Sequence, residues 1–262
     1  MYKDFLVILL FFVLAIPSIL SAADFTVFRW NSETTGTLQG EWDLGTLGSG
    51  KTEATFQPAK SNEVGFRLVM KVFSIPTEFS FNGISNSGGL TSGGEFQFKG
   101  VDFDTSQPMK YSMDTEVIDW FPRFPVLKKR RFGVDAILGV KAVFLDTTVE
   151  GTEDGTGNPV SSNLTAFVPV PMIGARVYLG DLRKGKFRIE AMARYFRMSL
   201  YETRIKALDA EIVTFAPIGA NIDVFGGWRW REQDITFDYD ENNRAGSIID
   251  SDGLFYGLRY RF

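Results

Sequence analysis

The last ten residues of the chain alternate between large apolar side chains and smaller or charged ones. Leu254, Tyr256, Leu258, Tyr260 and Phe262 occupy every second position, and glycine, arginine and one phenylalanine stand between them. Side chains of a β-strand point alternately to its two faces, so one face here is wholly apolar and the other mostly charged or small. The sequence therefore predicts a C-terminal β-strand with one apolar, aromatic face that must contact an apolar environment.

This segment resembles the closing strand of Gram-negative outer-membrane β-barrels, whose terminal aromatic residue is read by the barrel-insertion machinery. The resemblance implies an insertion signal made of five residues: Leu254, Tyr256, Leu258, Tyr260 and Phe262. It also implies location in the cell outer membrane, contact with lipid and lipopolysaccharide, and a C-terminus on the periplasmic side. The small-barrel families (OmpA membrane domain, OmpX, OmpW) are the nearest resemblance, in pattern over the mature chain and in motif over the last ten residues.

The first 23 residues have the pattern of a secretory signal peptide. Lys3 precedes an apolar run over residues 5–16, and small residues at 21–23 precede Asp24. The run is shorter than the roughly 20 apolar residues that a membrane helix requires. We therefore expect export through a cleaved signal peptide (residues 1–23) and one mature domain (residues 24–262).

Composition favours a membrane barrel over a soluble domain. Aromatic residues make up 15% of the chain, with 25 phenylalanines, while 23% of residues are charged. A lipid-facing wall with aromatic girdles and a polar interior uses both classes of residue. The net charge of −4 and the scattered lysines and arginines argue against nucleic acid as a partner. The chain has no cysteine, so it forms no disulfide, and we expect it to act as a monomer.

Segments of alternating apolar and polar residues predict ten transmembrane strands in an antiparallel up-and-down β-barrel, with eight strands as the alternative. These segments are residues 36–47, 62–73, 75–83, 109–121, 132–144, 164–180, 187–196, 206–216, 220–239 and the C-terminal strand. The connections at one end are short and those at the other mostly long, as such barrels require. The predicted short connections are Ser74 and residues 122–130, 181–185 and 217–219. The predicted outer loops cover residues 48–61, 84–108, 150–163 and 240–249, and the outer loop near Glu202 is the short exception.

Turning the polar face of each strand inward predicts a lumen lined by charges of both signs. Its members are Glu41, Arg67, Lys71, Glu116, Asp135, Lys141, Arg176, Arg188, Glu190, Arg194, Asp209, Glu211, Asp223, Arg229, Arg231 and Arg259. Met113 and Val117 then point outward, and Tyr111 belongs to an outer aromatic girdle. Charges in so narrow a space must be paired or hydrated. The lumen is therefore either plugged by a salt-bridge network or passes only small solutes, with little charge selectivity.

Catalysis is not expected. The chain contains no histidine and no cysteine, and general acid–base chemistry near neutral pH most often uses histidine. Outer-membrane barrels that are enzymes, such as the omptin-type proteases, resemble this chain in architecture but depend on a histidine. Their functional residues therefore cannot be carried over, and no cofactor or metal site is expected.

Two prolines, Pro169 and Pro171, interrupt the donors of the sixth predicted strand, since proline has no N–H to offer to a ladder. They could open the wall sideways to small hydrophobic molecules, or they could belong to the outer loop above a strand that starts lower.

Three functions remain open at this stage. They are a non-enzymatic barrel that is plugged or porin-like for small solutes, a carrier that uses the lateral opening, and a surface adhesion or binding module that acts through its outer loops, residues 84–108 above all.

Overall fold

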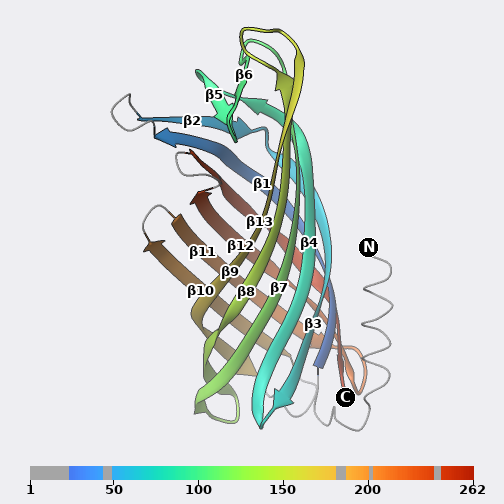
Figure 1. Ribbon diagram of the computed structural model, residues 1–262. Helices are drawn as coiled ribbons and strands as arrows, with labels where there is room; N and C mark the ends of the chain where they lie inside the picture. Colours follow the sequence, from blue (N-terminus) through green and yellow to red (C-terminus); the bar gives the residue numbers. More distant parts are fainter. Residues whose placement is uncertain (1–23, 44–48, 181–186, 201–202, 239–242) are drawn as a thin grey trace.

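The computed structural model describes residues 24–43, 49–180, 187–200, 203–238 and 243–262 (Figure 1). The predicted signal peptide, residues 1–23, lies outside these ranges. No helix among the described residues is long and apolar enough to cross a membrane.

The described residues form thirteen strands. They are β1 (Asp24–Asp43), β2 (Ser49–Phe56), β3 (Ala59–Val72), β4 (Ile75–Thr91), β5 (Phe96–Phe98), β6 (Val101–Phe103), β7 (Met109–Lys128), β8 (Phe132–Thr152), β9 (Pro159–Gly180), β10 (Arg188–Leu200), β11 (Thr203–Pro217), β12 (Ile222–Asp238) and β13 (Asn243–Arg261).

The strands close into an antiparallel barrel. Neighbours in sequence pair with one another, and β1 pairs with β13 from Asp24–Arg261 to Trp42–Asn243, so the sheet has no free side edge there. Strands β2 and β3 pair one after the other with β1 and together take the place of one strand of the wall, with residues 57–58 between them. The wall thus consists of ten strands, and the predicted ten-stranded all-β barrel is confirmed.

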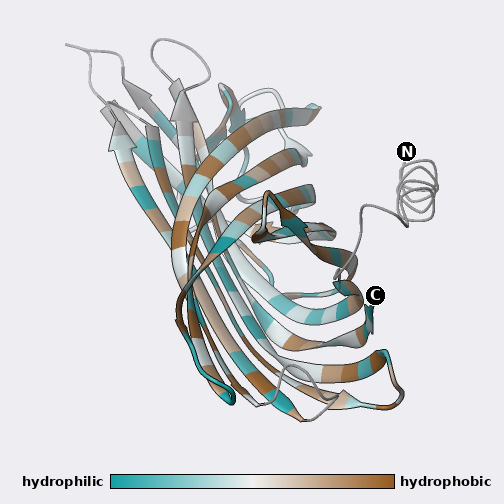
Figure 2. Cartoon of the chain, turned by 90° about the horizontal axis from the view of Figure 1, so that it is seen from below, coloured by the Kyte–Doolittle hydropathy of each residue, from teal (hydrophilic) through white to brown (hydrophobic). Residues whose placement is uncertain are grey.

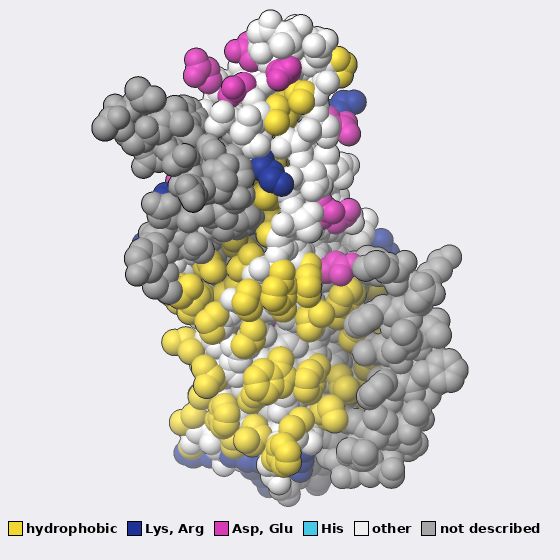
Figure 3. All heavy atoms as spheres, in the orientation of Figure 1, with side chains coloured by type: hydrophobic (Ala, Val, Ile, Leu, Met, Phe, Trp, Pro, Cys, Tyr) yellow, Lys and Arg dark blue, Asp and Glu magenta, His cyan; other side chains and the backbone are white. Residues whose placement is uncertain are grey.

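Hydropathy alternates along each strand, and this alternation sets which side chains face the lumen (Figure 2). On β8, Ile137 and Lys141 are buried while Leu138 is 55% exposed, and on β9 Met172 is buried while Ile173 is 63% exposed. Exposed apolar residues gather in a broad band over the wall, and acidic and uncharged polar residues lie above it (Figure 3). The band has the character of a lipid-facing surface.

The two chain termini of the barrel lie at one end, because Asp24 pairs with Arg261. We call this the terminal end. At the opposite, far end, β4, β7, β8 and β9 extend beyond the apolar band (Figure 1). The short strands β5 and β6 pair with each other as a hairpin at this far end, and β6 also forms a single antiparallel bridge from Phe103 to Glu153.

The β5–β6 hairpin covers the far mouth of the barrel. Phe96, Phe98 and Phe103 are buried in a cluster whose other members come from the inner faces of surrounding strands, including Leu38 and Leu164. The hairpin is held on both sides. The backbone N–H of Gln97 donates to Thr52 Oγ1 at 3.1 Å, and the Ser162 hydroxyl donates to the Phe98 carbonyl at 3.2 Å. We call the hairpin and this apolar cluster the cap.

Several predicted boundaries are wrong, and they err in one direction. The first strand begins at Asp24 instead of residue 36, and the predicted loops over residues 48–61, 84–108 and 150–163 are largely strand. For the predicted loops the reason is that the far-end ladders continue beyond the lipid band, where pairing with a neighbour no longer requires an alternating apolar face. At the terminal end, β1 starts earlier because residues 24–35 pair with β13 and residues 24–34 pair with β3. The predicted connections over residues 181–185 and around Glu202, and part of that over 240–249, lie outside the described residues.

Candidate functional site

Charged side chains fill the barrel between the cap and the terminal end. Among the described residues, nine cationic and seven anionic lumen side chains are buried. They are Arg67, Arg123, Lys141, Arg176, Arg188, Arg194, Arg229, Arg231 and Arg259, with Glu63, Glu78, Asp119, Asp135, Asp209, Glu211 and Asp223. We call this set the charge layer. Its two signs nearly balance, as a group of charges removed from bulk water requires.

Asp209, on β11, is the centre of the charge layer. Its carboxylate accepts from Lys141 Nζ at 2.8 Å, from Arg194 Nη2 at 3.0 Å and from Arg229 Nη2 at 2.9 Å. These cations come from β8, β10 and β12, so one carboxylate connects four strands of the wall across the lumen. Each of the four side chains is at most 1% exposed.

A second carboxylate, Glu78 on β4, connects another arc of the wall. It pairs with Arg123 of β7, with Arg194 Nη1 at 3.3 Å and with Arg67 Nε at 3.4 Å. Both terminal nitrogens of Arg67 also donate to the Glu211 carboxylate, at 2.7 and 2.8 Å. Two-pronged pairs of this kind are the strong form of a charge-assisted hydrogen bond. Because Arg194 contacts both Glu78 and Asp209, the two groups form one network.

Aromatic rings occupy the space between the guanidinium groups. Arg194 lies over the Phe121 ring at 4.1 Å, and Arg259 lies over the Phe215 ring at 4.0 Å. Trp30 is fully buried between Arg229 and Arg231, at 5.1 and 4.9 Å from its ring. These stacked cations and rings fill volume that a water path would need.

At the terminal end the charge layer leaves little space. Arg176 pairs with Asp135 at 2.9 Å and with Glu190 at 2.8 Å, while Arg259 pairs with Asp223. The cavity beside these groups has a volume of about 20 Å³ and is lined by residues that include Arg176 and Arg259. A space of this size holds about one water molecule. This cavity therefore has room for about one water molecule beside Arg176 and Arg259.

The wall itself is incomplete between β9 and β10. The ladder of these strands runs from Arg188–Gly180 to Tyr195–Ile173 and goes no further among the described residues. Both strands continue, β9 to Pro159 and β10 to Leu200, but their far ends point apart (Figure 1). We call this interruption the seam.

Pro171 and Pro169 are the next outward-facing residues of β9 above the last paired position. They lie inside the strand, since the ladder between β9 and β8 is continuous through Ala142–Pro169 and Val140–Pro171. Their place in the outer loop, one of the two alternatives left by the sequence, is thus wrong. Proline removes donors from a strand edge, and here pairing is lost on the β10 side only. The two prolines thus coincide with the start of the seam.

The inner wall behind the seam is apolar. Val168, Val170 and Met172 of β9 are buried in a cluster with Met192 of β10, and Phe196 and Met198 pack against it half-buried. Methionine and small aliphatic groups adapt to ligands of irregular shape. A molecule that entered sideways would therefore meet apolar surface before it met the charge layer.

Most residues predicted to line the lumen lie in the charge layer, but six predicted placements are wrong: those of Lys71, Glu116 and Glu41, and those of Tyr111, Met113 and Val117. Lys71 lies on the inward row of β3, but its side chain is exposed beyond the charge layer. Glu116 points outward, as does Glu41, which pairs with Lys51 and Arg244 on the outer face. Tyr111, predicted for an outer girdle, is buried inward, as are Met113 and Val117.

Four members of the charge layer were missing from the predicted set: Glu63, Glu78, Asp119 and Arg123. Glu63 and Glu78 stand on the polar faces of their predicted strands, so the pattern contained them. Asp119 was assigned to the wrong face because Met113 and Val117 were taken as outward. Arg123 lies in residues 122–130, which were predicted to be a turn and in fact belong mostly to β7.

The predicted insertion-signal residues form the outer face of β13. Leu254, Leu258, Tyr260 and Phe262 are 41–53% exposed, and Tyr256 is half-buried on the same face. The alternate residues Phe255 and Arg259 point inward into the aromatic cluster and the charge layer. The last strand therefore closes the barrel through one face and presents an aromatic surface on the other.

Solved structures with this architecture are outer-membrane proteins. The outer membrane protease OmpT from Escherichia coli superimposes with a TM-score of 0.61 at 11% sequence identity, over 92% of this chain and 97% of that chain. The translocator domain of the autotransporter NalP from Neisseria meningitidis has a TM-score of 0.47 at 12% identity, over 100% and 96% of the two chains. The attachment invasion locus protein Ail of Yersinia pestis has a TM-score of 0.33 at 9% identity, over 92% and 99%.

No family model matches the sequence, and no curated protein matches it. The similarity to OmpT therefore concerns the fold alone. At that level the resemblance to outer-membrane β-barrels, drawn from the last ten residues, is confirmed.

Proposed function

We propose that this protein is a non-enzymatic outer-membrane barrel that is closed to solutes along its axis, with its far end outside the cell. The observation that carries the proposal is the charge layer, in which Asp209 alone binds cations from three other strands. The cap adds a second, apolar closure above it. OmpT is a protease, but the present chain has no histidine to act as a base.

A flux experiment tests the closed axis. Residues 24–262 are refolded into liposomes loaded with potassium chloride, beside a variant in which residues 95–104 are replaced by a short glycine-serine linker. We expect neither protein to release potassium faster than loaded liposomes without protein, because the charge layer seals the barrel below the cap. Potassium release by the unmodified barrel would overturn the proposal. Release by the linker variant alone would show that the cap, and not the charge layer, closes the barrel.

A second function is favoured by the seam. We propose that small apolar molecules enter the barrel from the membrane between β9 and β10 and bind against Val170, Met172 and Met198. The proposed closure along the axis does not conflict with this route, because a ligand that enters between β9 and β10 would bind above the charge layer and would not have to pass through it. An apolar inner surface directly behind an interruption of the wall suits a lipid-soluble ligand and would not serve an ion.

The absence of cysteine from the chain makes this route testable by single-cysteine labelling. Met172→Cys places a thiol behind the seam, and Val213→Cys places an equally buried thiol in the aromatic cluster. A membrane-soluble maleimide should label Met172→Cys several-fold faster than Val213→Cys. Adding Pro169→Val and Pro171→Val should restore donors to β9 and slow the first reaction. Equal rates, or no effect of the two valines, would remove the lateral route.

A further inference from the structure

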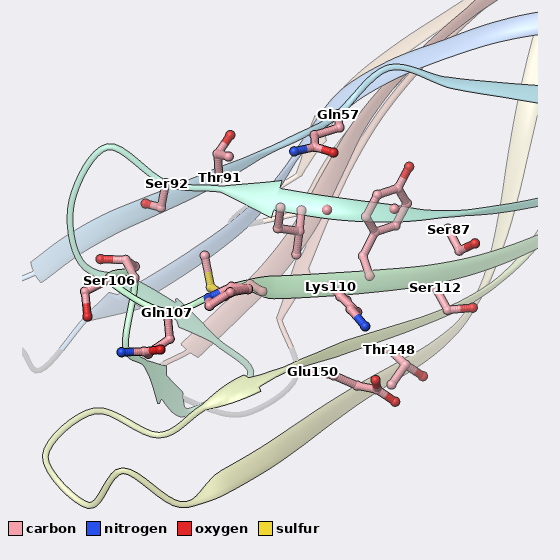
Figure 4. A pocket seen from close by; sticks show the side chains of 17 residues that line it. Gln57, Ser87, Thr91, Ser92, Ser106, Gln107, Lys110, Ser112, Thr148 and Glu150 are labelled. Carbon is pink, nitrogen blue, oxygen red and sulfur yellow. The ribbon is translucent and has the colours of Figure 1, made fainter.

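A second cavity lies above the apolar band, on the outer face of the far end, and belongs to neither the charge layer nor the seam. It has a volume of about 750 Å³ and is formed by the ends of β4, β7 and β8 together with the turn before β7 (Figure 4). This volume falls within the range of ordinary ligand pockets. We call it the far-end pocket.

Two rows of paired residues form its wall. Gly89, Lys110 and Glu150 are neighbours across β4, β7 and β8, and Ser87, Ser112 and Thr148 form the next row. All of these except Gly89 project polar groups at the pocket (Figure 4). The strands therefore present regularly spaced hydroxyl, ammonium and carboxylate groups to whatever enters.

The turn before β7 forms the opposite side. Thr105, Ser106, Gln107 and Pro108 line the pocket here. The turn has its own hydrogen bonds, since the backbone N–H and the hydroxyl of Ser106 both donate to Asp104 Oδ1, at 2.9 and 2.6 Å. The pocket is thus bounded by two ordered sides.

The lining is hydroxyl-rich and almost uncharged. Its charged members are Lys110 and Glu150, one of each sign, and neither has an ion-pair partner among the described residues. Serine, threonine and glutamine provide most of the other polar groups. Such a surface offers many neutral donors and acceptors, which a multiply charged or purely apolar ligand would leave unpaired.

The floor of the pocket is formed by β4 and β7. Gly88 and Gly89 add no side chain to it, and a side chain at Gly89 would lie 2.9 Å from the Gln57 side chain, which also lines the pocket. On the lumen side of the same wall, Tyr111 is 2% exposed, pairs with Gly88 across the ladder and stacks on Phe56 at 4.4 Å, so the floor is supported from behind.

We propose that the far-end pocket binds a short neutral glycan. Sugar rings carry hydroxyl groups that both donate and accept, which matches a wall of hydroxyls and amides with one cation and one anion. The two sources of such a ligand are the neutral outer sugars of lipopolysaccharide in the same membrane and a free or foreign surface glycan. This site goes beyond the closed axis and the seam, and neither of those proposals depends on it.

The test compares two tryptophan variants of the refolded barrel in lipid nanodiscs. Ser112→Trp fills the pocket from an exposed position of its wall, and Ser199→Trp places the same side chain on an exposed position of β10 outside the pocket. Binding is measured to an array of neutral oligosaccharides and, separately, to de-acylated lipopolysaccharide. The double variant Lys110→Ala, Glu150→Ala serves as a second probe that adds no bulk.

We expect saccharide binding by the unmodified barrel and by Ser199→Trp, and at least about tenfold weaker binding by Ser112→Trp and the double alanine variant. Binding to the array alone indicates a foreign or free glycan, and binding to de-acylated lipopolysaccharide indicates the same membrane. Failure of the unmodified barrel to bind either probe would overturn the proposal, as would equal binding by the two tryptophan variants.

Discussion

At the scale of single residues, the interior of this barrel depends on carboxylates that serve several cations at once. Asp209 meets Lys141, Arg194 and Arg229 within 3.0 Å, and each of these side chains is buried. A buried cation that loses its anion keeps the cost of desolvation without the compensating attraction. The structure therefore places more of its stability on Asp209 than on any exposed carboxylate of the wall.

We predict that Asp209→Asn lowers the free energy of unfolding by about 3 to 5 kcal/mol, the usual cost of breaking a buried ion pair. Asp114→Asn, on the exposed face of β7, is the control and should change it by less than about 0.5 kcal/mol. Urea unfolding of the refolded barrel, followed by tryptophan fluorescence, measures both. Similar losses for the two variants would show that Asp209 is not a structural centre.

The orientation of β7 gives a second prediction at this scale. Glu116 points outward and Asp119 is fully buried, the reverse of what the sequence pattern indicated. In the refolded barrel, a membrane-impermeant maleimide should label Glu116→Cys within minutes and Asp119→Cys far more slowly. Rapid labelling of Asp119→Cys would contradict the face assigned to β7.

At the scale of elements, the β5–β6 hairpin and the seam set how the barrel is closed and where it is open. The hairpin approaches β1 closely, since a side chain at Gly40 would lie 2.0 Å from the Gln97 carbonyl oxygen. Glycine at this position allows two backbones to approach each other. The cap therefore depends on Gly40 as well as on its phenylalanines.

We predict that Gly40→Ala displaces the hairpin and exposes Lys99 to trypsin. Gly93→Ala is the matched control, because a side chain there would meet nothing within 4 Å. Limited proteolysis of the refolded barrels should cleave after Lys99 several-fold faster in Gly40→Ala than in Gly93→Ala. Equal cleavage of the two would mean that the hairpin does not rest against β1.

Strand patterns predicted the elements well where the wall touches lipid and poorly elsewhere. Over residues 132–144 of β8 and 254–260 of β13 each outward residue is apolar and most inward residues are polar or small, so alternation alone gave both faces. In β7 the inward Met113 packs into the apolar cluster of the cap and the inward Val117 is buried, while Asp114 and Glu116 lie on the outer face. Apolar side chains inside and charges outside reverse the usual pattern there, and the prediction followed the pattern.

For the candidate site, too, the sequence predicted one part and missed another: it placed most charged residues on the inner wall but did not give their partners. Thirteen of the sixteen predicted lumen charges were placed by alternation and lie on the inner wall among the buried or half-buried residues. Their partners could not be predicted, because which cation meets Asp209 depends on the stagger of strands across the lumen. Pro169 and Pro171 marked the seam from sequence alone, but the absence of pairing with β10 appears only in the ladder.

At the scale of the whole molecule, the barrel has three layers with different chemistry. The charge layer fills the lumen at the level of the apolar band, an apolar inner wall lies behind the seam, and the cap closes the far mouth. Above the apolar band, the far-end pocket offers a polar surface. On the proposed function, this arrangement closes the route along the axis and leaves sideways entry and outside binding as the routes to a ligand.

Single-channel recording tests that closure most directly. The refolded barrel, residues 24–262, is inserted into a planar bilayer after its folding has been checked by resistance to unfolding in detergent without heat. The structure predicts a flat current at all voltages, because paired charges and stacked rings occupy the lumen and the cavity beside Arg176 and Arg259 at the terminal end has a volume of about 20 Å³. Steady, stepwise openings would show a continuous water path through the charge layer and would contradict the account.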